Sequence, residues 1–87
     1  MKFAAVVEVR ALDGIADPEA ATVERALPLL GLDSVSEMRM GRIFRFVVEA
    51  VDATVAQITA EDLSHRLLAN PVIQRADVSV SPLDVSR

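Results

Sequence analysis

The sequence contains no cysteine, tryptophan or tyrosine, and it has only one histidine and three glycines. Without cysteine the chain cannot form a disulfide, a thiolate metal site or a thiol nucleophile. Without tryptophan or tyrosine it offers few surfaces on which single-stranded bases could stack, and its net charge of −4 disfavours binding to phosphate backbones. We therefore expect no nucleic-acid partner, and a cytoplasmic location is the expectation for a cysteine-free chain.

Long apolar runs are also missing. No run of about 18 apolar residues occurs, so neither a membrane-spanning helix nor a membrane partner is expected. The 87 residues are nevertheless 52 % hydrophobic, and three phenylalanines are the only aromatic residues. This composition predicts one small domain with an aliphatic core, which we place at 1–81, followed by a C-terminal tail at 82–87.

The spacing of apolar residues predicts four strands and two helices. Asp17 and Asp52 are typical residues at the start of a helix, and Pro28 should bend or end the first helix early. Gly41 separates two adjacent strand patterns and predicts a tight turn between them. The expected strands are 2–10, 34–40, 42–51 and 72–80, and the expected helices run from about 18 to 30 and from 53 to 69.

The resulting order, β-α-β-β-α-β, predicts an α+β fold of the ferredoxin-like split βαβ type. Its sheet would be antiparallel, with both helices on one face. The other face would be open, with apolar residues at its centre and charged residues around them, as in protein interfaces. We expect this face to bind a second copy of the chain through Ala4, Val6, Ile43, Arg45 and Val47.

Candidate catalytic groups are few. His65 has no nucleophile or second histidine at a suitable spacing, and a surface role explains it better than acid–base chemistry. No phosphate-binding glycine motif is present, and the acidic residues do not have the spacing of a metal loop. We therefore expect no catalytic residue and no metal site.

Arginines are concentrated between the two central strand patterns, at Arg39, Arg42 and Arg45. Guanidinium groups form forked contacts with anions and carboxylates, so these residues could bind a partner. Alternatively, they could form cross-strand pairs with Glu37 and Glu49. Spacing alone leaves both interpretations open.

Three segments of the sequence form a distinctive set. Residues 67–73 read LLANPVI, 17–19 read DPE before VERAL at 23–27, and 35–42 read VSEMRMGR. Together they resemble the "LLANPVI", "DPxG…VxRAL…LG" and "VxxVRxGK" patterns of one known family, PurS, and the resemblance covers about 2–80. Pro28, the alternation Phe44-Arg45-Phe46 and the tail after Pro82 depart from the family pattern.

The resemblance implies a small subunit of phosphoribosylformylglycinamidine (FGAM) synthase, a glutamine-dependent ligase of purine biosynthesis. Such a subunit would carry no active site or cofactor, while ATP and Mg²⁺ would be used by the partner synthetase, PurL. It would form a homodimer or tetramer, bridge PurL and the glutaminase PurQ, and assist ammonia transfer. Carried over by position, Gly41 and Arg42 match the family's glycine–basic pair, and with Arg39 they are candidate partner contacts.

Two other functions are compatible with the same predicted fold. An ACT-like regulatory module would bind a small molecule, with Asp13-Gly14 as its loop after the first strand. An acylphosphatase-like enzyme would need a glycine-rich phosphate loop after that strand. Only Arg10 is near, and the single asparagine, Asn70, lies at a helix end, so this reading is the least favoured.

Overall fold

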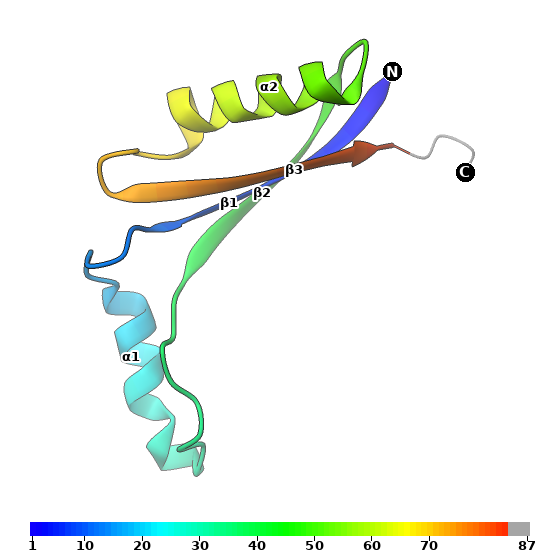
Figure 1. Cartoon of the computed structure of the whole chain (residues 1–87). Helices are drawn as coiled ribbons and strands as arrows, with labels where there is room; N and C mark the ends of the chain where they lie inside the picture. The colour runs from blue at the N-terminus through cyan, green and yellow to red at the C-terminus, as the bar shows by residue number, and fades with distance from the viewer. Residues whose placement is uncertain (84–87) are drawn as a thin grey trace.

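The computed structural model describes residues 1–83, which form a three-stranded antiparallel sheet and two helices (Figure 1). The strands are β1 (Lys2–Ala11), β2 (Gly41–Glu49) and β3 (Gln74–Pro82), and the order across the sheet is β2-β1-β3. The helices are α1 (Pro18–Ala26) and α2 (Ala53–Leu63). The expected ferredoxin-like α+β class, with an antiparallel sheet and the first strand at its centre, is confirmed.

β1 forms the centre of the core because its side chains alternate between buried and half-buried along its length. Phe3, Ala5, Val7 and Val9 are almost completely buried. Phe3 and Ala5 form one apolar cluster with Val48 of β2 and with Ala56 and Ala60 of α2; the flanking, partly buried members of this cluster are Phe46, Ala50, Val78 and Val80. The strand predicted at 2–10 is confirmed.

The predicted strand at 34–40 is wrong, and so is the tight turn at Gly41. Residues 35–40 have no regular structure and run back beside α1 (Figure 1). Glu37 has a φ of 56°, which interrupts an extended strand. Gly41 is instead the first residue of β2 and pairs with Arg10 of β1. A Cβ at Gly41 would lie 2.8 Å from the carbonyl oxygen of Val9, so close strand contact, not turn geometry, requires the glycine.

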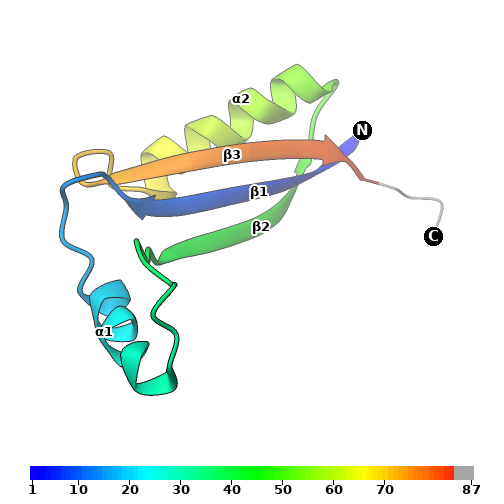
Figure 2. The same ribbon diagram turned by 60° about the horizontal axis from the view of Figure 1, so that its bottom comes forward.

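Pro28 ends the first helix early, as predicted. α1 stops at Ala26, a 3₁₀ turn follows at Pro28–Leu30, and Gly31 closes it in the left-handed conformation with a φ of 74°. The expectation that both helices cover one face of the sheet is wrong, because α1 points away from the side that α2 covers (Figures 1 and 2). We call the whole projection, residues 17–40, the arm.

α2 packs on the sheet through small side chains. Ala56, Ala60 and Ser64 recur every four residues and are buried, and the Ser64 hydroxyl donates to the carbonyl of Ala60 at 2.8 Å. The regular helix ends at Leu63 and continues as a π-type turn, Ser64–Leu68. The regular helix is therefore shorter than the expected 53–69, and Leu67 in the wider turn is exposed.

Asn70 stabilises the turn that precedes the last strand. Its side-chain oxygen accepts the N–H of Val72, and its carbonyl accepts the N–H of Gln74 at 2.7 Å. β3 then extends to Pro82, and the N–H of Leu83 donates to the carbonyl of Lys2. Most of the predicted tail, residues 84–87, lies outside the described residues.

The described chain is elongated because the arm leaves the sheet. Its extents are 51 × 34 × 15 Å and its radius of gyration is 16.8 Å. A compact domain of this length would have a radius of gyration of about 12 Å. The arm therefore has little contact with the rest of its own chain.

Candidate functional site

The open face of the sheet lies on the side away from α2 (Figure 2). The strand register brings the predicted interface residues together on it. In the register of β1 and β2, Ala4 pairs with Val47, and Val6 pairs with Arg45. Ile43 pairs with Glu8 and therefore lies on the same face. The five predicted residues thus share one face, with Arg45 between Ile43 and Val47.

The centre of the open face is apolar and accessible. Ile43 is 50 % exposed and Val47 is 56 % exposed, while Ala4 and Val6 are half-buried by their neighbours. Ser79 and Ser81 of β3 pair with Val6 and Ala4 and line the other flank. These two serines were not among the predicted site residues, although the alternation of β3 places them opposite Val78 and Val80.

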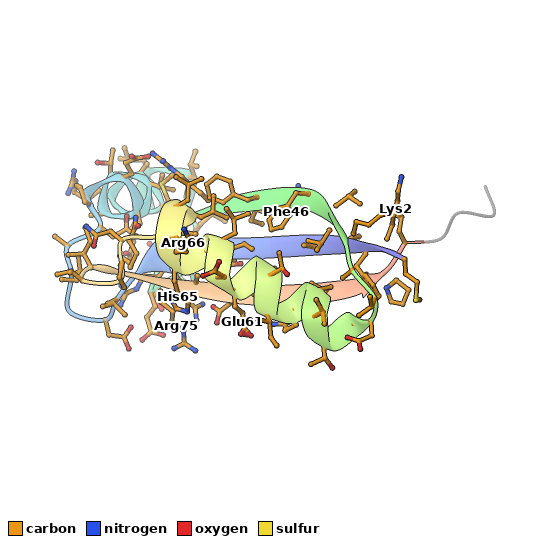
Figure 3. The ribbon with its side chains drawn as sticks, turned by 90° about the horizontal axis from the view of Figure 1, so that it is seen from above. Lys2, Phe46, Glu61, His65, Arg66 and Arg75 are labelled. Carbon is orange, nitrogen blue, oxygen red and sulfur yellow. The ribbon has the colours of Figure 1, made fainter. Side chains whose placement is uncertain are left out.

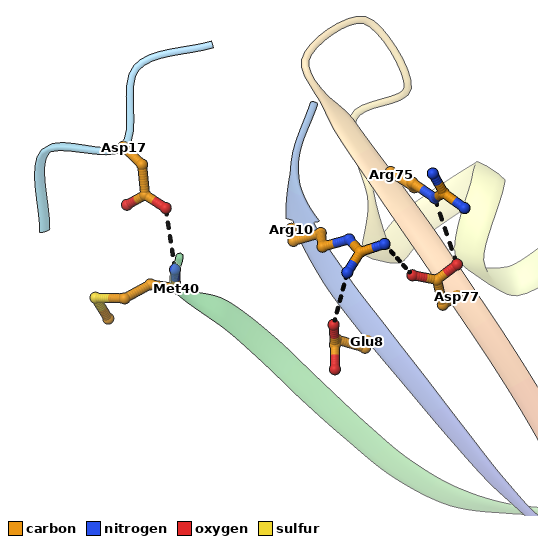
Figure 4. Close-up of polar contacts among 6 residues, drawn as sticks. All are labelled: Glu8, Arg10, Asp17, Met40, Arg75 and Asp77. Atoms are coloured by element: carbon orange, nitrogen blue, oxygen red, sulfur yellow. Dashed lines mark hydrogen bonds and ion pairs between the residues drawn. The ribbon is translucent and has the colours of Figure 1, made fainter. Parts of the chain in front are cut away.

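Charged residues close one end of the open face (Figure 4). Arg10 contacts Asp77 at 3.1 Å and Glu8 at 3.6 Å, and Arg75 contacts Asp77 at 3.4 Å. All four side chains are about half exposed, so each ion pair contributes little to stability. Their arrangement gives the open face an apolar centre with a charged end.

The three predicted partner contacts lie at the root of the arm but not on one surface. Arg39 contacts Asp13 at 3.5 Å and lines a hollow with Glu8, Arg10 and other residues of the open-face side. Arg42 pairs with Val9, so it lies on the side that α2 covers and not at a turn as expected. Gly41 lies between them in the sequence. The structure therefore brings the three close together while directing the two arginines to opposite faces.

Asp17 fixes the root of the arm. One carboxylate oxygen accepts the N–H of Ala20 at 3.1 Å and caps α1; the other accepts the N–H of Met40 at 3.0 Å (Figure 4). These bonds, led by the one from Met40, lower the pKa of the Asp17 carboxyl below its usual value of 3.8. Sequence reasoning found the cap but missed the bond to Met40, since a contact between residues 23 positions apart has no local signal.

A hollow of about 270 Å³ lies where the arm joins the sheet. Asp17, Glu19, Met40, Gly41 and Arg42 contribute to its lining. It is open and contains no paired acid and base in contact. Its position marks the junction of arm and sheet, and its residues do not form a catalytic arrangement.

The remaining chemistry-bearing side chains are dispersed. His65 is exposed near the end of α2, next to Arg66 (Figure 3). Within residues 1–83, no group of three metal-binding side chains occurs. Among the helices that the structure describes, none is long and apolar enough to cross a membrane.

Comparison with known proteins identifies one family. Residues 4–82 match the family model described as "PurS: Phosphoribosylformylglycinamidine (FGAM) synthase". The chain is 38 % identical to the FGAM synthase subunit PurS of Methanothermobacter thermautotrophicus, over 97 % of this chain and 99 % of that protein. It is 28 % identical to PurS of Methanocaldococcus jannaschii, over 94 % of this chain and 99 % of that protein.

Solved structures agree with the fold. PurS of Thermus thermophilus is 29 % identical and superposes with a TM-score of 0.85 over 97 % of this chain and 100 % of that one. A chain in the structure of PurLQS from Thermotoga maritima is 26 % identical, with a TM-score of 0.85 over 93 % of this chain and 99 % of that one.

Proposed function

The chain belongs to the PurS family, and from this we propose that it is a non-catalytic subunit of a phosphoribosylformylglycinamidine synthase, a ligase of purine biosynthesis. The observation that carries the proposal is the match of residues 4–82 to the family model. The described residues add a second argument, because they hold an apolar open face and no assembled catalytic group. A chain of this kind acts through the surfaces it offers to other subunits.

We propose that the partners are the synthetase PurL and the glutaminase PurQ. A related chain occurs in the structure of PurLQS from Thermotoga maritima, which supports such an assembly here. In this role the chain would hold the two enzymes close together, so that ammonia passes from PurQ to PurL before it is protonated in bulk water. ATP and Mg²⁺ would act at PurL, with no cofactor on this chain.

Reconstitution of the reaction tests this role. Purified PurL and PurQ from the same organism should form the amidine from glutamine only when this chain is added. With ammonium salt in place of glutamine, PurL should need neither PurQ nor this chain, because ammonia is then supplied directly. Glutamine-dependent activity that is equal with and without the chain would overturn the proposal.

A pair of variants tests the partner surface. Arg39→Ala combined with Arg42→Ala should lower the glutamine-dependent rate, because both guanidinium groups lie at the root of the arm. Arg66→Ala is the matched control, since Arg66 is exposed in the turn that follows α2 and pairs only with Asp62 among the described residues. Equal rates for both proteins would place the partner contacts elsewhere.

The open face supports self-association within the same proposal. A second copy placed on it would bury Ala4, Val6, Ile43 and Val47 between two sheets, as in sheet-on-sheet packing. Arg45, which has no ion pair among the described residues, would have to meet a carboxylate of the other copy. A homodimer built on this face, or a tetramer with a further interface, follows from the proposal.

A further inference from the structure

Three arginines line one hollow at the end of the sheet. Arg10 of β1, Arg39 of the arm and Arg75 of β3 contribute to its wall, and Asp13 supplies the one carboxylate. The hollow has a volume of about 240 Å³, which is room for several water molecules at about 30 Å³ each. Three segments that are far apart in the sequence therefore place guanidinium groups around one space.

This hollow is positively charged in a chain whose net charge is −4. Its ionisable lining consists of three arginines and one aspartate. The hollow at the root of the arm has two arginines and two acidic residues in its lining, and the hollow beside α2 has two acidic residues and one histidine. Of these three hollows, the one that Arg75 lines is therefore the most attractive to an anion.

The sheet register holds two of these arginines directly opposite each other. Arg10 of β1 pairs with Arg75 of β3. Like charges at opposite positions of antiparallel strands are destabilising. Asp77 contacts Arg10 at 3.1 Å and Arg75 at 3.4 Å, so one carboxylate is shared between the two guanidinium groups (Figure 4). A further anion in the hollow would reduce the repulsion between the two arginines.

The existing ion pairs leave donors for such an anion. Arg75 contacts Asp77 through Nε, which leaves its two terminal nitrogens for another acceptor. Arg39 contacts Asp13 through one terminal nitrogen at 3.5 Å, and the Asp13 side chain is fully exposed. Exposed pairs of this kind contribute little to stability. A ligand that accepts from several donors at once would therefore replace them readily.

We propose that Arg10, Arg39 and Arg75 form a binding site for a phosphoryl group, either of free phosphate or of a small phosphorylated molecule. A phosphoryl group has three strong acceptor oxygens and a charge of about −1.5 to −2 near neutral pH. Guanidinium groups form forked, charge-assisted bonds with such oxygens, and three of them surround this hollow. A carboxylate has two oxygens and one charge, so it would engage fewer of these donors.

The proposed phosphoryl site is separate from the proposed subunit contacts. It lies at the end of the open face, since Arg10 is four residues along β1 from Val6 at the apolar centre. Arg10 and Arg75 are not among the proposed contacts with PurL or PurQ. The site is therefore tested on the isolated chain, and its failure would leave the role in FGAM synthase untouched.

Titration of the isotope-labelled chain with sodium phosphate, followed by NMR, tests the site. The Nε signals of Arg10, Arg39 and Arg75 should shift and reach saturation, together with the backbone amide signal of Asp13. Sodium chloride at equal ionic strength should give small shifts that do not saturate, because it only screens the charges. Equal shifts with the two salts would overturn the proposal.

A double variant tests the assigned arginines. Arg39→Ala combined with Arg75→Ala should weaken phosphate binding by about tenfold or more, because two charged donors are lost. Both side chains are about half exposed, so the circular dichroism spectrum should stay unchanged. Arg66→Ala is the matched control, since Arg66 pairs with Asp62 away from the hollow. Phosphate affinity of the double variant equal to that of the unmodified chain would overturn the proposal.

Two further titrations identify the chemistry of the ligand. Glycerol phosphate, a small phosphate monoester, should shift the same arginine signals. Affinity at least equal to that for inorganic phosphate would assign the site to a phosphorylated molecule, while binding of inorganic phosphate alone would assign it to the free ion; either result supports the proposal. Acetate that binds as tightly as phosphate would overturn it, because the site would then have no preference for a phosphoryl group.

Discussion

Asp17 joins two parts of the chain that are distant in the sequence. Its carboxylate is the N-cap of α1 and also accepts the N–H of Met40, the last residue before β2. A single side chain therefore fixes both ends of the arm where they meet the sheet. Since both bonds favour the ionised form, the pKa of Asp17 is lowered in the folded chain.

Because this pKa is lowered on folding, Asp17 makes the stability of the folded state depend on pH in a known direction. The ionised carboxylate stabilises the folded state at pH values above 3.8, and the contribution is lost as the pH falls below 3.8 through the lower pKa of the folded chain. Asp17→Asn should keep the cap on Ala20 but lose the bond from Met40. Its melting temperature should be below that of the unmodified chain at neutral pH, and the gap should narrow as the pH falls below 3.8.

Asp33→Asn is the control for this measurement. Asp33 is an exposed carboxylate of the same arm, and no hydrogen bond or ion pair joins it to other described residues. Its substitution should leave the melting temperature unchanged at both pH values. A gap for Asp17→Asn that stays constant with pH would contradict the assigned role of the carboxylate.

The role of a residue was predictable from the sequence where it depends on neighbours only a few positions away. Asp17 and Asp52 cap the two helices, and Pro28 ends the first helix early, as the sequence indicates. Gly41 was assigned to a turn, because a glycine between two strand patterns usually marks one. A glycine is required at this position because the carbonyl oxygen of Val9 lies too close for a Cβ. This contact depends on strand pairing, so the local sequence does not reveal it.

At the scale of elements, α2 approaches the sheet closely because its buried residues are small. Ala56 and Ala60 have no exposed surface, and both contact the cluster around Phe3. A larger side chain at either position would have to push the helix away from β1. The short side chains thus set the distance between helix and sheet.

Ala56→Leu should therefore destabilise the fold by about 1–3 kcal/mol, the usual cost of overfilling a packed core. Ala53→Leu is the matched control, since Ala53 is the exposed first residue of the same helix. Its effect should stay within about 0.5 kcal/mol. Urea unfolding followed by circular dichroism measures both, and equal effects would show that α2 does not pack as described.

The elements themselves were predictable where hydrophobic periodicity had a single interpretation. β1 and its alternation follow from the sequence, and β2 and β3 lie within two residues of the expected bounds. The segment 34–40 also has a strand-like pattern but forms no strand, because the arm carries it along α1 and away from the outer side of β2. Periodicity reports which residues are suited to a strand, and not whether a neighbouring strand is within reach.

At the scale of the whole molecule, the described chain buries few of its large apolar side chains and exposes many of them. Its exposed large apolar side chains outnumber its buried ones, and its radius of gyration exceeds that of a compact domain. The sequence indicated this surplus of apolar residues and correctly grouped four of them, together with Arg45, on one face. It did not indicate the arm, whose direction depends on long-range contacts.

Val47→Glu tests the open face at this scale. The substitution places a charge at the centre of the apolar patch, where burial without a partner is costly. Self-association through this face should weaken by about tenfold or more, with the circular dichroism spectrum unchanged. Light scattering coupled to size exclusion measures the assembly.

Val51→Glu is the control for this substitution, because Val51 is 78 % exposed and lies beyond the end of β2. It should leave the assembly unchanged. An assembly of the same size for Val47→Glu would show that the interface lies elsewhere.

The loss of the expected strand at 34–40 leaves β2 at the margin of the sheet. Along its outer side, peptide groups of residues 41–49 point toward solvent and could pair with an unrelated extended chain. Arg42, Arg45 and Glu49 place charges along this margin on both faces of the strand. Such charges disfavour pairing between the edges of two sheets. They therefore reduce the tendency of the unassembled chain to aggregate through β2.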